Sequence, residues 1–206
     1  MAPRDGRCKV NMKDISLIGF MGCGKSSVGK ILATLLPECR LIDLDTYIEE
    51  KQGKNIPEIF NEYGEAAFRR MEREALEEIF SDKSRPRAIL SLGGGTVTSE
   101  QCRQLIRQHT DCFYLRATTD TLLDNLEGHS DGRPMLNPTQ PVEAQSTETS
   151  SEREALRHRI ESLMQTRSPQ YIATAHHIID IDGLSFTQIA ALIKEAVEAN
   201  TLNIKR

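Results

Sequence analysis

The chain has 206 residues, of which 38% are hydrophobic and 27% are charged, a composition that fits one ordinary domain or a domain with a sizeable insertion. Lysine and arginine number 26 against 30 acidic residues, and the resulting net charge of -4 gives no global electrostatic surface for nucleic acid or an anionic membrane. No apolar run is long enough to span a bilayer, and residues 1–13 lack the apolar core of a secretory signal. We therefore expect a cytoplasmic protein with a flexible leader at residues 1–13 and no membrane or nucleic-acid partner. We also expect a monomer, although nothing in the composition bears on the oligomeric state.

The cysteines are odd in number and have no C-x-x-C spacing, which argues against a disulfide framework and against a zinc site. Cys23 lies within a glycine-rich loop, where we interpret it as a small residue that fits rather than as a reactive thiol. We expect free thiols at Cys8, Cys23, Cys39, Cys102 and Cys112.

That glycine-rich loop follows the first predicted strand, residues 15–18. The pattern Gly19-x-x-x-x-Gly24-Lys25-Ser26 lets successive backbone N–H groups turn inward around a phosphate oxygen. Lys25 adds a positive charge for the outer phosphates, Ser26 offers a hydroxyl to Mg²⁺, and the helix predicted to start here points its positive N-terminus at the same place. A chance glycine turn is the alternative, but it would not need the helical apolar face formed by Val28, Ile31, Leu32, Leu35 and Leu36. The loop therefore predicts a nucleoside triphosphate site.

Two carboxylates end the next predicted strand, residues 40–45. Side chains alternate along an extended segment, so Asp43 and Asp45 should point to the same side at the carboxyl edge of the sheet, where ligands bind in open α/β sheets. We interpret one carboxylate as lying near Mg²⁺ and the other near a substrate hydroxyl. The alternative, which is compatible with this role, is that Asp45 caps the helix predicted to follow.

Two helices are predicted next, a short one at residues 56–60 and a long one from residue 65 to about residue 80. Arg69 flanks the apolar face of the long helix, and Glu72 three residues later can contact it and hold its guanidinium in place. An oriented arginine can bind a carboxylate through two hydrogen bonds. The alternative is that Arg69 and Arg70 belong to a solvated face.

A buried strand is predicted at residues 88–92, and Gly93, Gly94 and Gly95 follow it directly. Three glycines in succession indicate backbone that passes close to a helix or to a ligand. A helix near residues 99–108, a strand at residues 112–115 and a helix at residues 120–126 come next.

Residues 127–151 are predicted to form a mobile lid, since they are rich in polar residues and hold few core-forming ones. Arg133 would be carried onto the phosphates when such a lid closes. A charged helix is predicted at residues 152–167, ended by Pro169, so that Arg167 in its last turn can interact with the helix dipole. A fifth strand at residues 176–181, whose two histidines are given no metal role, and a last helix from residue 185 complete the chain.

Strands alternate with helices throughout, which predicts a parallel sheet with right-handed crossovers. The expected fold is one α/β domain of the P-loop NTPase class over residues 14–206. It is a three-layer sandwich with helices on both faces of a five-stranded sheet and a mobile lid.

Taken together, the motifs resemble the shikimate kinase family. They are the loop at residues 19–26, the Asp43-Leu44-Asp45 pair, Phe68-Arg69-Arg70-Met71-Glu72, Leu92-Gly93-Gly94-Gly95, Gly132-Arg133-Pro134 and Arg167-Ser168-Pro169-x-Tyr171. They occur in the family's order over residues 14 to about 182, and the combination is far more specific than any one of them. The resemblance implies transfer of the γ-phosphate of ATP to the 3-hydroxyl of shikimate with Mg²⁺, on a sheet with the strand order 2-3-1-4-5.

The resemblance also implies a role for each matching residue. Lys25, Asp45 and Arg133 would be catalytic, with Asp45 close enough to accept the proton of the 3-hydroxyl. Ser26 and Asp43 would hold Mg²⁺, Asp43 through water. The ATP site would comprise Gly22, Cys23, Gly24, Lys25, Ser26, Ser27 and the lid residue Arg133. The shikimate site, which includes a helical region at about residues 45–80, would comprise Asp45, Arg69, Gly93, Gly94, Gly95 and Arg167, with the two arginines clamping the carboxylate.

This chain departs from the family pattern in two places. Many members carry an arginine ahead of the lid that stacks on adenine, whereas this chain reads Asp124-Asn125-Leu126 there, and residues 137–151 are longer than the usual lid. Two alternatives stay open. A kinase for another polyhydroxy acid, such as gluconate, would share the phosphate loop but not the whole motif set. A non-catalytic nucleotide-binding module predicts loss of catalytic residues that are present here.

Overall fold

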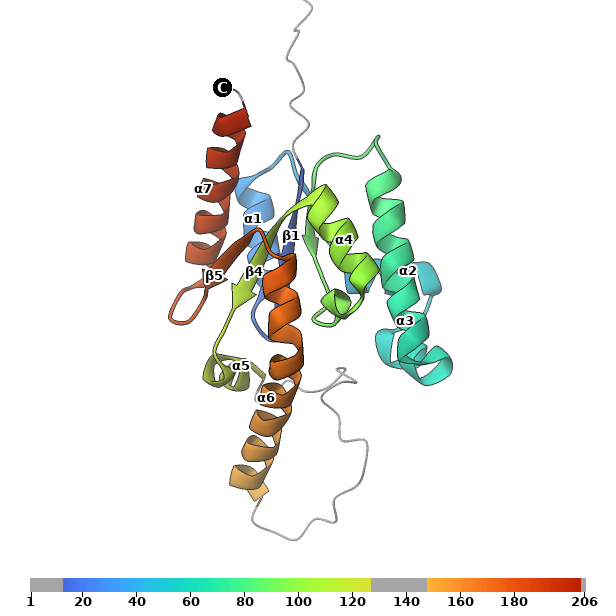
Figure 1. Ribbon diagram of the computed structural model, residues 1–206, viewed down its shortest axis with the longest axis vertical. Helices are drawn as coiled ribbons and strands as arrows, with labels where there is room; N and C mark the ends of the chain where they lie inside the picture. Colours follow the sequence, from blue (N-terminus) through green and yellow to red (C-terminus); the bar gives the residue numbers. More distant parts are fainter. Residues whose placement is uncertain (1–12, 127–147, 205–206) are drawn as a thin grey trace, which may run out of the picture.

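The computed structural model describes residues 13–126 and 148–204, whose fold is built on a five-stranded parallel sheet. Its strands are β1 (Asp14–Ile18), β2 (Arg40–Asp43), β3 (Ala88–Ser91), β4 (Thr110–Arg116) and β5 (His177–Asp180). They lie in the order β2-β3-β1-β4-β5, which confirms the expected order (Figure 1). The chain leaves β1 toward one edge of the sheet and later crosses to the other edge, so a ligand crevice is expected at the carboxyl ends of the strands beside β1.

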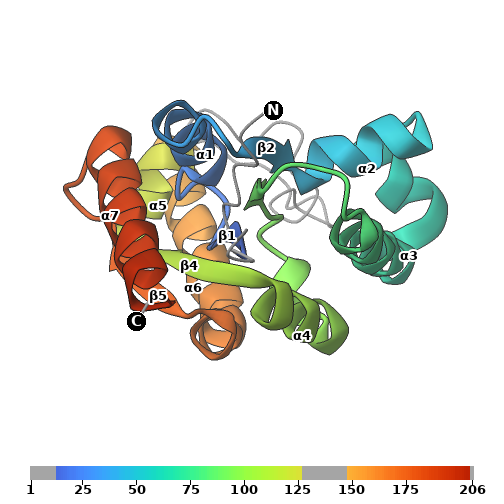
Figure 2. The ribbon, with the colours of Figure 1, turned by 90° about the horizontal axis from the view of Figure 1, so that it is seen from above.

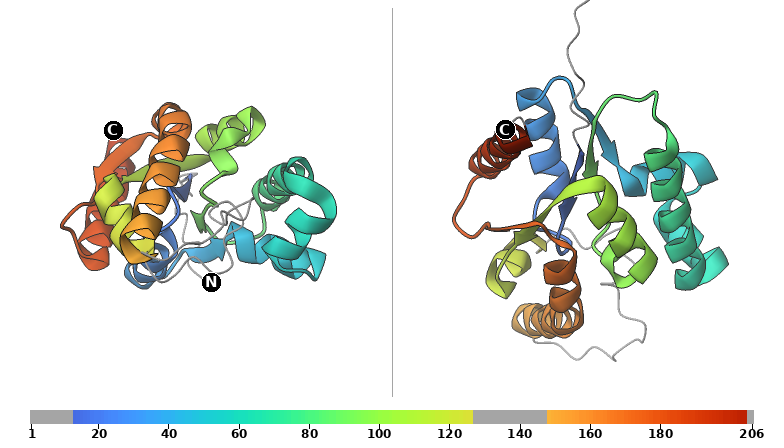
Figure 3. Two further views of the ribbon diagram at one scale, coloured as in Figure 1. Left: turned by 90° about the horizontal axis from the view of Figure 1, so that it is seen from below. Right: turned by 45° about the horizontal axis from the view of Figure 1, so that its top comes forward.

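Helices cover both faces of the sheet because successive strand residues enter two different apolar cores. In β4, Phe113 and Leu115 enter one core, whereas Cys112 and Tyr114 enter the other. The first core is closed mainly by α1 (Lys25–Leu35), α5 (Thr119–Leu126) and α7 (Phe186–Ile204). The second is closed by α2 (Leu44–Gln52), α3 (Ile56–Ser81), η1 (Thr96–Thr98) and α4 (Glu100–His109), while α6 (Glu148–Thr174) contributes to both. Figures 2 and 3 show α7 and α3 on opposite flanks of the molecule, as the predicted three-layer arrangement requires.

One helical region agrees with the prediction and another differs from it. The two helices predicted at residues 56–60 and 65–80 are the two parts of α3, whose backbone leaves helical geometry between them at Gly64 (φ 76°, ψ 169°). Helix α6 begins at Glu148 rather than at residue 152 and continues past Pro169 to its last residue, so the prediction that this proline ends the helix is wrong. Tyr171 and Thr174 are fully buried in the last turns, and their packing outweighs the single backbone hydrogen bond that a proline removes.

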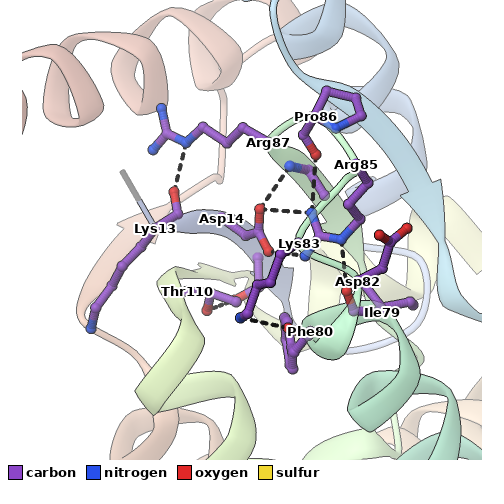
Figure 4. A network of polar contacts seen from close by, with 12 residues as sticks. Lys13, Asp14, Ile79, Phe80, Asp82, Lys83, Arg85, Pro86, Arg87 and Thr110 are labelled. Carbon is purple, nitrogen blue, oxygen red and sulfur yellow. Dashed lines mark hydrogen bonds and ion pairs between the residues drawn. The ribbon is translucent and has the colours of Figure 1, made fainter. Parts of the chain in front are cut away.

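A buried ion pair fixes the end of the sheet opposite the glycine-rich loop (Figure 4). Asp14 at the start of β1 is 9% exposed and accepts hydrogen bonds from both terminal nitrogens of Arg85 and, at 2.8 Å, from the backbone N–H of Ala88. Arg85 also donates to the carbonyl of Ile79 in α3 at 2.7 Å. These contacts join β1, the segment leading into β3 and the end of α3.

Four of the five cysteines lie among the described residues, and all four are buried free thiols, as expected; Cys8 lies outside them. Over residues 13–126 and 148–204, no helix is both long and apolar enough to cross a membrane. Residues 1–12 of the predicted leader and residues 127–147 of the predicted lid lie outside the described part of the chain.

Candidate active site

The loop between β1 and α1 has the backbone that a phosphate cradle requires. Gly22 and Gly24 have φ values of 85° and 86°, a region that other residues rarely adopt. Lys25 is 8% exposed, and its Nζ donates to the carbonyls of Gly19 and Phe20 at 2.8 and 2.9 Å, which keeps the ammonium group inside the loop. The N-terminus of α1 points into the same loop, so amides, helix dipole and ammonium together favour an anion.

Ser26 and Asp43 form a cluster of hard oxygen atoms beside this loop. The Ser26 hydroxyl donates to Oδ2 of Asp43 at 2.8 Å and lies 3.2 Å from the hydroxyl of Ser91 at the end of β3. Asp43 also caps α2, since its side chain accepts from the backbone N–H of Thr46 at 3.4 Å. A hydroxyl and a carboxylate next to a phosphate site suit Mg²⁺, which prefers oxygen ligands and keeps several waters.

Asp45 lies in the first turn of α2, not in a strand, so the predicted alternation with Asp43 is wrong. The alternative role of Asp45 as the helix cap is also wrong, because Asp43 is the cap. Both carboxylates nevertheless line one cavity, because the turn from β2 into α2 carries them to the same side. Burial, followed by the charges of Glu72 and Asp43, raises the pKa of Asp45 to about 6. A carboxylate with a pKa near neutrality is suited to accept a proton from a substrate hydroxyl.

Arg69 is held by acidic residues on its own helix, as predicted from the spacing. Its Nη1 donates to Oε2 of Glu72 at 2.7 Å and its Nη2 to Oε1 of Glu65 at 2.9 Å. Glu72 is completely buried and accepts a further hydrogen bond from the hydroxyl of Thr96, while burial raises the pKa of its carboxyl group. The side chain of Arg69 is 15% exposed, whereas Arg70 is exposed, so the solvated-face interpretation holds for Arg70 alone.

Each of the three glycines after β3 lies so close to a different neighbouring group that a side chain there would crowd it. A Cβ atom on Gly93 would lie 2.9 Å from Oδ1 of Asp45, and one on Gly95 would lie 2.3 Å from Nη2 of Arg69. A Cβ on Gly94 would lie 3.1 Å from the backbone nitrogen of Met21 in the phosphate loop. The glycines therefore let the backbone pass close to Asp45, Arg69 and the phosphate loop. This is the close approach that three successive glycines predicted.

Arg167 approaches from α6 and is 4% exposed. Its Cζ lies 5.9 Å from the centre of the Phe20 ring, and its Nη1 is buried without a hydrogen-bond partner in the part of the chain that the structure describes. Because α6 continues to Thr174, Arg167 is not in the last turn, and the predicted dipole interaction does not account for it. A buried guanidinium nitrogen without a partner is costly unless an acceptor arrives with a ligand.

These side chains share one cavity of about 470 Å³ at the carboxyl edge of the sheet. All the predicted site residues within the described part of the chain line it, except Cys23, which is completely buried with its sulfur 3.8 Å from Nζ of Lys25. Arg133 lies outside the described residues. The cavity thus joins an anion-binding loop, two guanidinium groups and a carboxylate.

Several residues that line this cavity were not predicted as site residues, among them Ser91, Asn125, Phe60 and Phe186. Ser91 could have been found, because it ends a buried strand at the same edge as Asp43. Asn125 donates to the carbonyl of Gly22 at 2.9 Å. The other two, Phe60 and Phe186, are aromatic residues at helical spacing that nothing in the sequence distinguishes from ordinary apolar faces.

The comparisons with known proteins agree with one another. The family model described as shikimate kinase matches residues 21–198. The shikimate kinase of Thermus thermophilus is 35% identical over 184 residues, which cover 89% of this chain and 88% of that protein. The structure of shikimate kinase from Acinetobacter baumannii in complex with shikimate has a TM-score of 0.76 and 30% identity, covering 93% of this chain and 96% of the other. Shikimate kinase from Bacteroides thetaiotaomicron has the same TM-score of 0.76 and 29% identity, covering 91% of this chain and 99% of the other. With a matching family model over most of its length and relatives of this similarity, the chain belongs to the shikimate kinase family.

Proposed function

We propose that this protein transfers the γ-phosphoryl group of ATP to the 3-hydroxyl of shikimate, giving shikimate 3-phosphate and ADP on the route to chorismate and the aromatic amino acids. One observation carries the proposal: Arg69 and Arg167, from separate helices, line the same cavity as Asp45 and the phosphate loop. Shikimate has one carboxylate and several ring hydroxyls, and this set of groups is complementary to it. The family of the chain and the shikimate bound to the Acinetobacter baumannii enzyme support the same assignment.

In this proposal the two guanidinium groups bind the substrate carboxylate. Glu72 and Glu65 already orient Arg69, so it loses little freedom when it binds. Nη1 of Arg167, which has no hydrogen-bond partner among the described residues, would gain an acceptor from the substrate carboxylate. Asp45 then accepts hydrogen bonds from ring hydroxyls, and the backbone of Gly93, Gly94 and Gly95 closes the remaining side of the ring.

The phosphate loop would bind the nucleotide through main-chain amides at residues 22–27, which include Gly22, Cys23, Gly24 and Ser27. Lys25 would exchange its loop carbonyls for phosphate oxygens. Ser26 and Asp43 would hold Mg²⁺, which when bound neutralises phosphate charge. Their hydroxyl and carboxylate oxygens fit that ion.

The chemical step then depends on position and charge. Asp45 accepts the proton of the 3-hydroxyl, whose oxygen attacks the terminal phosphorus in line with the departing ADP. Lys25 stabilises charge that develops on the phosphate oxygens, and we propose the same role for Arg133. We also propose that residues 127–151 act as a lid that carries Arg133 and excludes water, that residues 1–13 form a leader, and that the enzyme works as a monomer in the cytoplasm.

A substrate screen tests this function. Purified protein is mixed with ATP, Mg²⁺ and one small acid at a time, and ADP release is followed with a coupled assay. Turnover is expected with shikimate and not with gluconate or quinate. Turnover with gluconate alone would replace the proposed substrate, and ATP binding without turnover on any acid would identify a non-catalytic nucleotide-binding module.

A further inference from the structure

Tyr171 lies one helical turn after Arg167, and the proposed function assigns it no task. Its side chain is completely buried, and its ring stacks on that of Tyr114 in β4 with centroids 4.9 Å apart and an interplanar angle of 20°. Its hydroxyl donates a hydrogen bond to the backbone carbonyl of Gly94, 77 residues earlier in the chain. A ring that served only to fill the core would need no hydroxyl, and a buried hydroxyl must find an acceptor.

The carbonyl of Gly94 differs from the carbonyls of the two neighbouring glycines in its hydrogen-bond partner. The carbonyls of Gly93 and Gly95 are used within the loop, where they accept from the backbone N–H groups of Thr96 at 3.1 Å and Thr98 at 2.9 Å. The carbonyl of Gly94 instead leaves the loop and is held by α6. On its other side Gly94 lies against the phosphate loop, since a Cβ there would be 3.1 Å from the nitrogen of Met21.

Because a trans peptide is planar, the hydrogen bond to the carbonyl of Gly94 also fixes the direction of the next N–H group. The carbonyl of Gly94 and the N–H of Gly95 belong to one peptide unit and point in opposite directions. When Tyr171 holds the carbonyl toward α6, the N–H of Gly95 is directed away from α6. Gly95 lines the cavity and lies directly against the guanidinium group of Arg69.

We propose that Tyr171 is a positioning residue, whose hydroxyl fixes the Gly94–Gly95 peptide so that the amide of Gly95 donates a hydrogen bond to the bound acid. This inference rests on the proposed function. It also links two parts of the substrate site, because the same turn of α6 carries Arg167 and the phenol that orients the glycine loop. A phenylalanine would fill the same space and leave the carbonyl of Gly94 free to rotate.

The test is Tyr171→Phe, with Tyr114→Phe as the matched control that removes a hydroxyl from the stacked partner ring. We expect Tyr171→Phe to raise the KM for shikimate about tenfold, the loss that one misplaced hydrogen bond produces, and to leave the KM for ATP within about twofold. Tyr114→Phe should change neither value. The proposal is overturned if both KM values rise together, if the shikimate KM is unchanged, or if the control reproduces the effect.

A second measurement needs no variant. In wild-type protein labelled with ¹⁵N-glycine, the amide resonance of Gly95 should shift downfield when shikimate is added without nucleotide, and an unchanged resonance would contradict the proposed donor. Failure of the proposed function is recognised separately, because wild-type enzyme would then neither bind nor phosphorylate shikimate. If wild-type enzyme is active and either measurement fails, the role proposed for Tyr171 is lost and the proposed function stands.

Discussion

Asp45→Asn should make the protein more stable and inactive. The carboxyl group has an ordinary pKa of 3.8, and burial with neighbouring negative charge raises it to about 6 in the folded protein. At pH values between 3.8 and about 6, Asp45 binds its proton more tightly in the folded state than in the unfolded state. Stability contributed by the protonated form is therefore lost as pH rises through this window, and above pH 6 the folded protein carries a buried charge that it would be more stable without. Asparagine removes that charge and keeps the shape of the side chain.

The magnitude follows from the same two values. The difference between a pKa of 3.8 and one of about 6 corresponds to about 3 kcal/mol, an upper limit because water reaches the cavity. Linkage gives a penalty at pH 5 of about half this limit, and the full penalty of about 3 kcal/mol above pH 7.5. The stability advantage of Asp45→Asn over wild type should therefore grow as pH rises and reach its plateau near pH 7.

Urea unfolding of ligand-free wild type and Asp45→Asn at pH 5 and pH 7.5 measures this difference. The matched control is Asp124→Asn, which removes an exposed carboxylate on α5 and should change the free energy of unfolding by less than about 1 kcal/mol. Activity of Asp45→Asn should fall by about two to four orders of magnitude with ATP affinity unchanged. A variant that is less stable than wild type, or equally stabilised at both pH values, would refute the assignment of a raised pKa to Asp45.

Three further predictions concern neighbouring residues. Arg69→Lys should raise the KM for shikimate more than about tenfold, because an ammonium group cannot bind Glu72 and a carboxylate in one plane, whereas Arg70→Lys should leave it unchanged; equal effects of the two would contradict the clamp. Glu72→Gln should shift the acid limb of kcat/KM to lower pH, since it removes a charge that raises the pKa of Asp45; an unmoved limb would argue against that coupling. Gly24→Ala should abolish ATP binding in calorimetry, because φ is 86° and a Cβ would lie 2.5 Å from the ring of Phe186; retained affinity would show that the loop tolerates a side chain.

The fold was predictable because local and global signals agree. Each strand is a short apolar run followed by a helix with a clear apolar face, and parallel crossovers leave few arrangements. The prediction was wrong where tertiary packing overrides a local rule. Pro169 is a helix-ending residue by propensity, yet buried Tyr171 and Thr174 hold the helix together beyond it.

The site was predictable where chemistry and position are local. Arg69 and Glu72 are three residues apart on one helix, so their contact follows from helical geometry. The two aspartates were placed at the correct edge for a wrong reason, since a capped helix rather than a strand presents Asp45. The helix cap decides where the strand ends and the helix begins. Two aspartates two positions apart are equally good candidate caps, so residue type alone cannot tell them apart.

Contacts between residues far apart in the chain could not be predicted from the sequence. Nothing in a sequence pattern states that the hydroxyl of Tyr171 reaches the carbonyl of Gly94, or that Thr96 donates to Glu72. These contacts arise only when the helices pack on the sheet. They also orient the groups that local motifs identify, which is why the motifs alone do not describe the site.

The central claim is that the two guanidinium groups and Asp45 bring one particular hydroxyl of the acid to the terminal phosphate of ATP. It is tested most directly by ³¹P–¹H correlation NMR of the product formed from shikimate and ATP. We predict a single phosphate monoester coupled to the proton at carbon 3, together with one equivalent of ADP. Phosphate on another ring position, or a mixture of positions, would contradict the geometry, because these groups would then not fix the ring in one orientation.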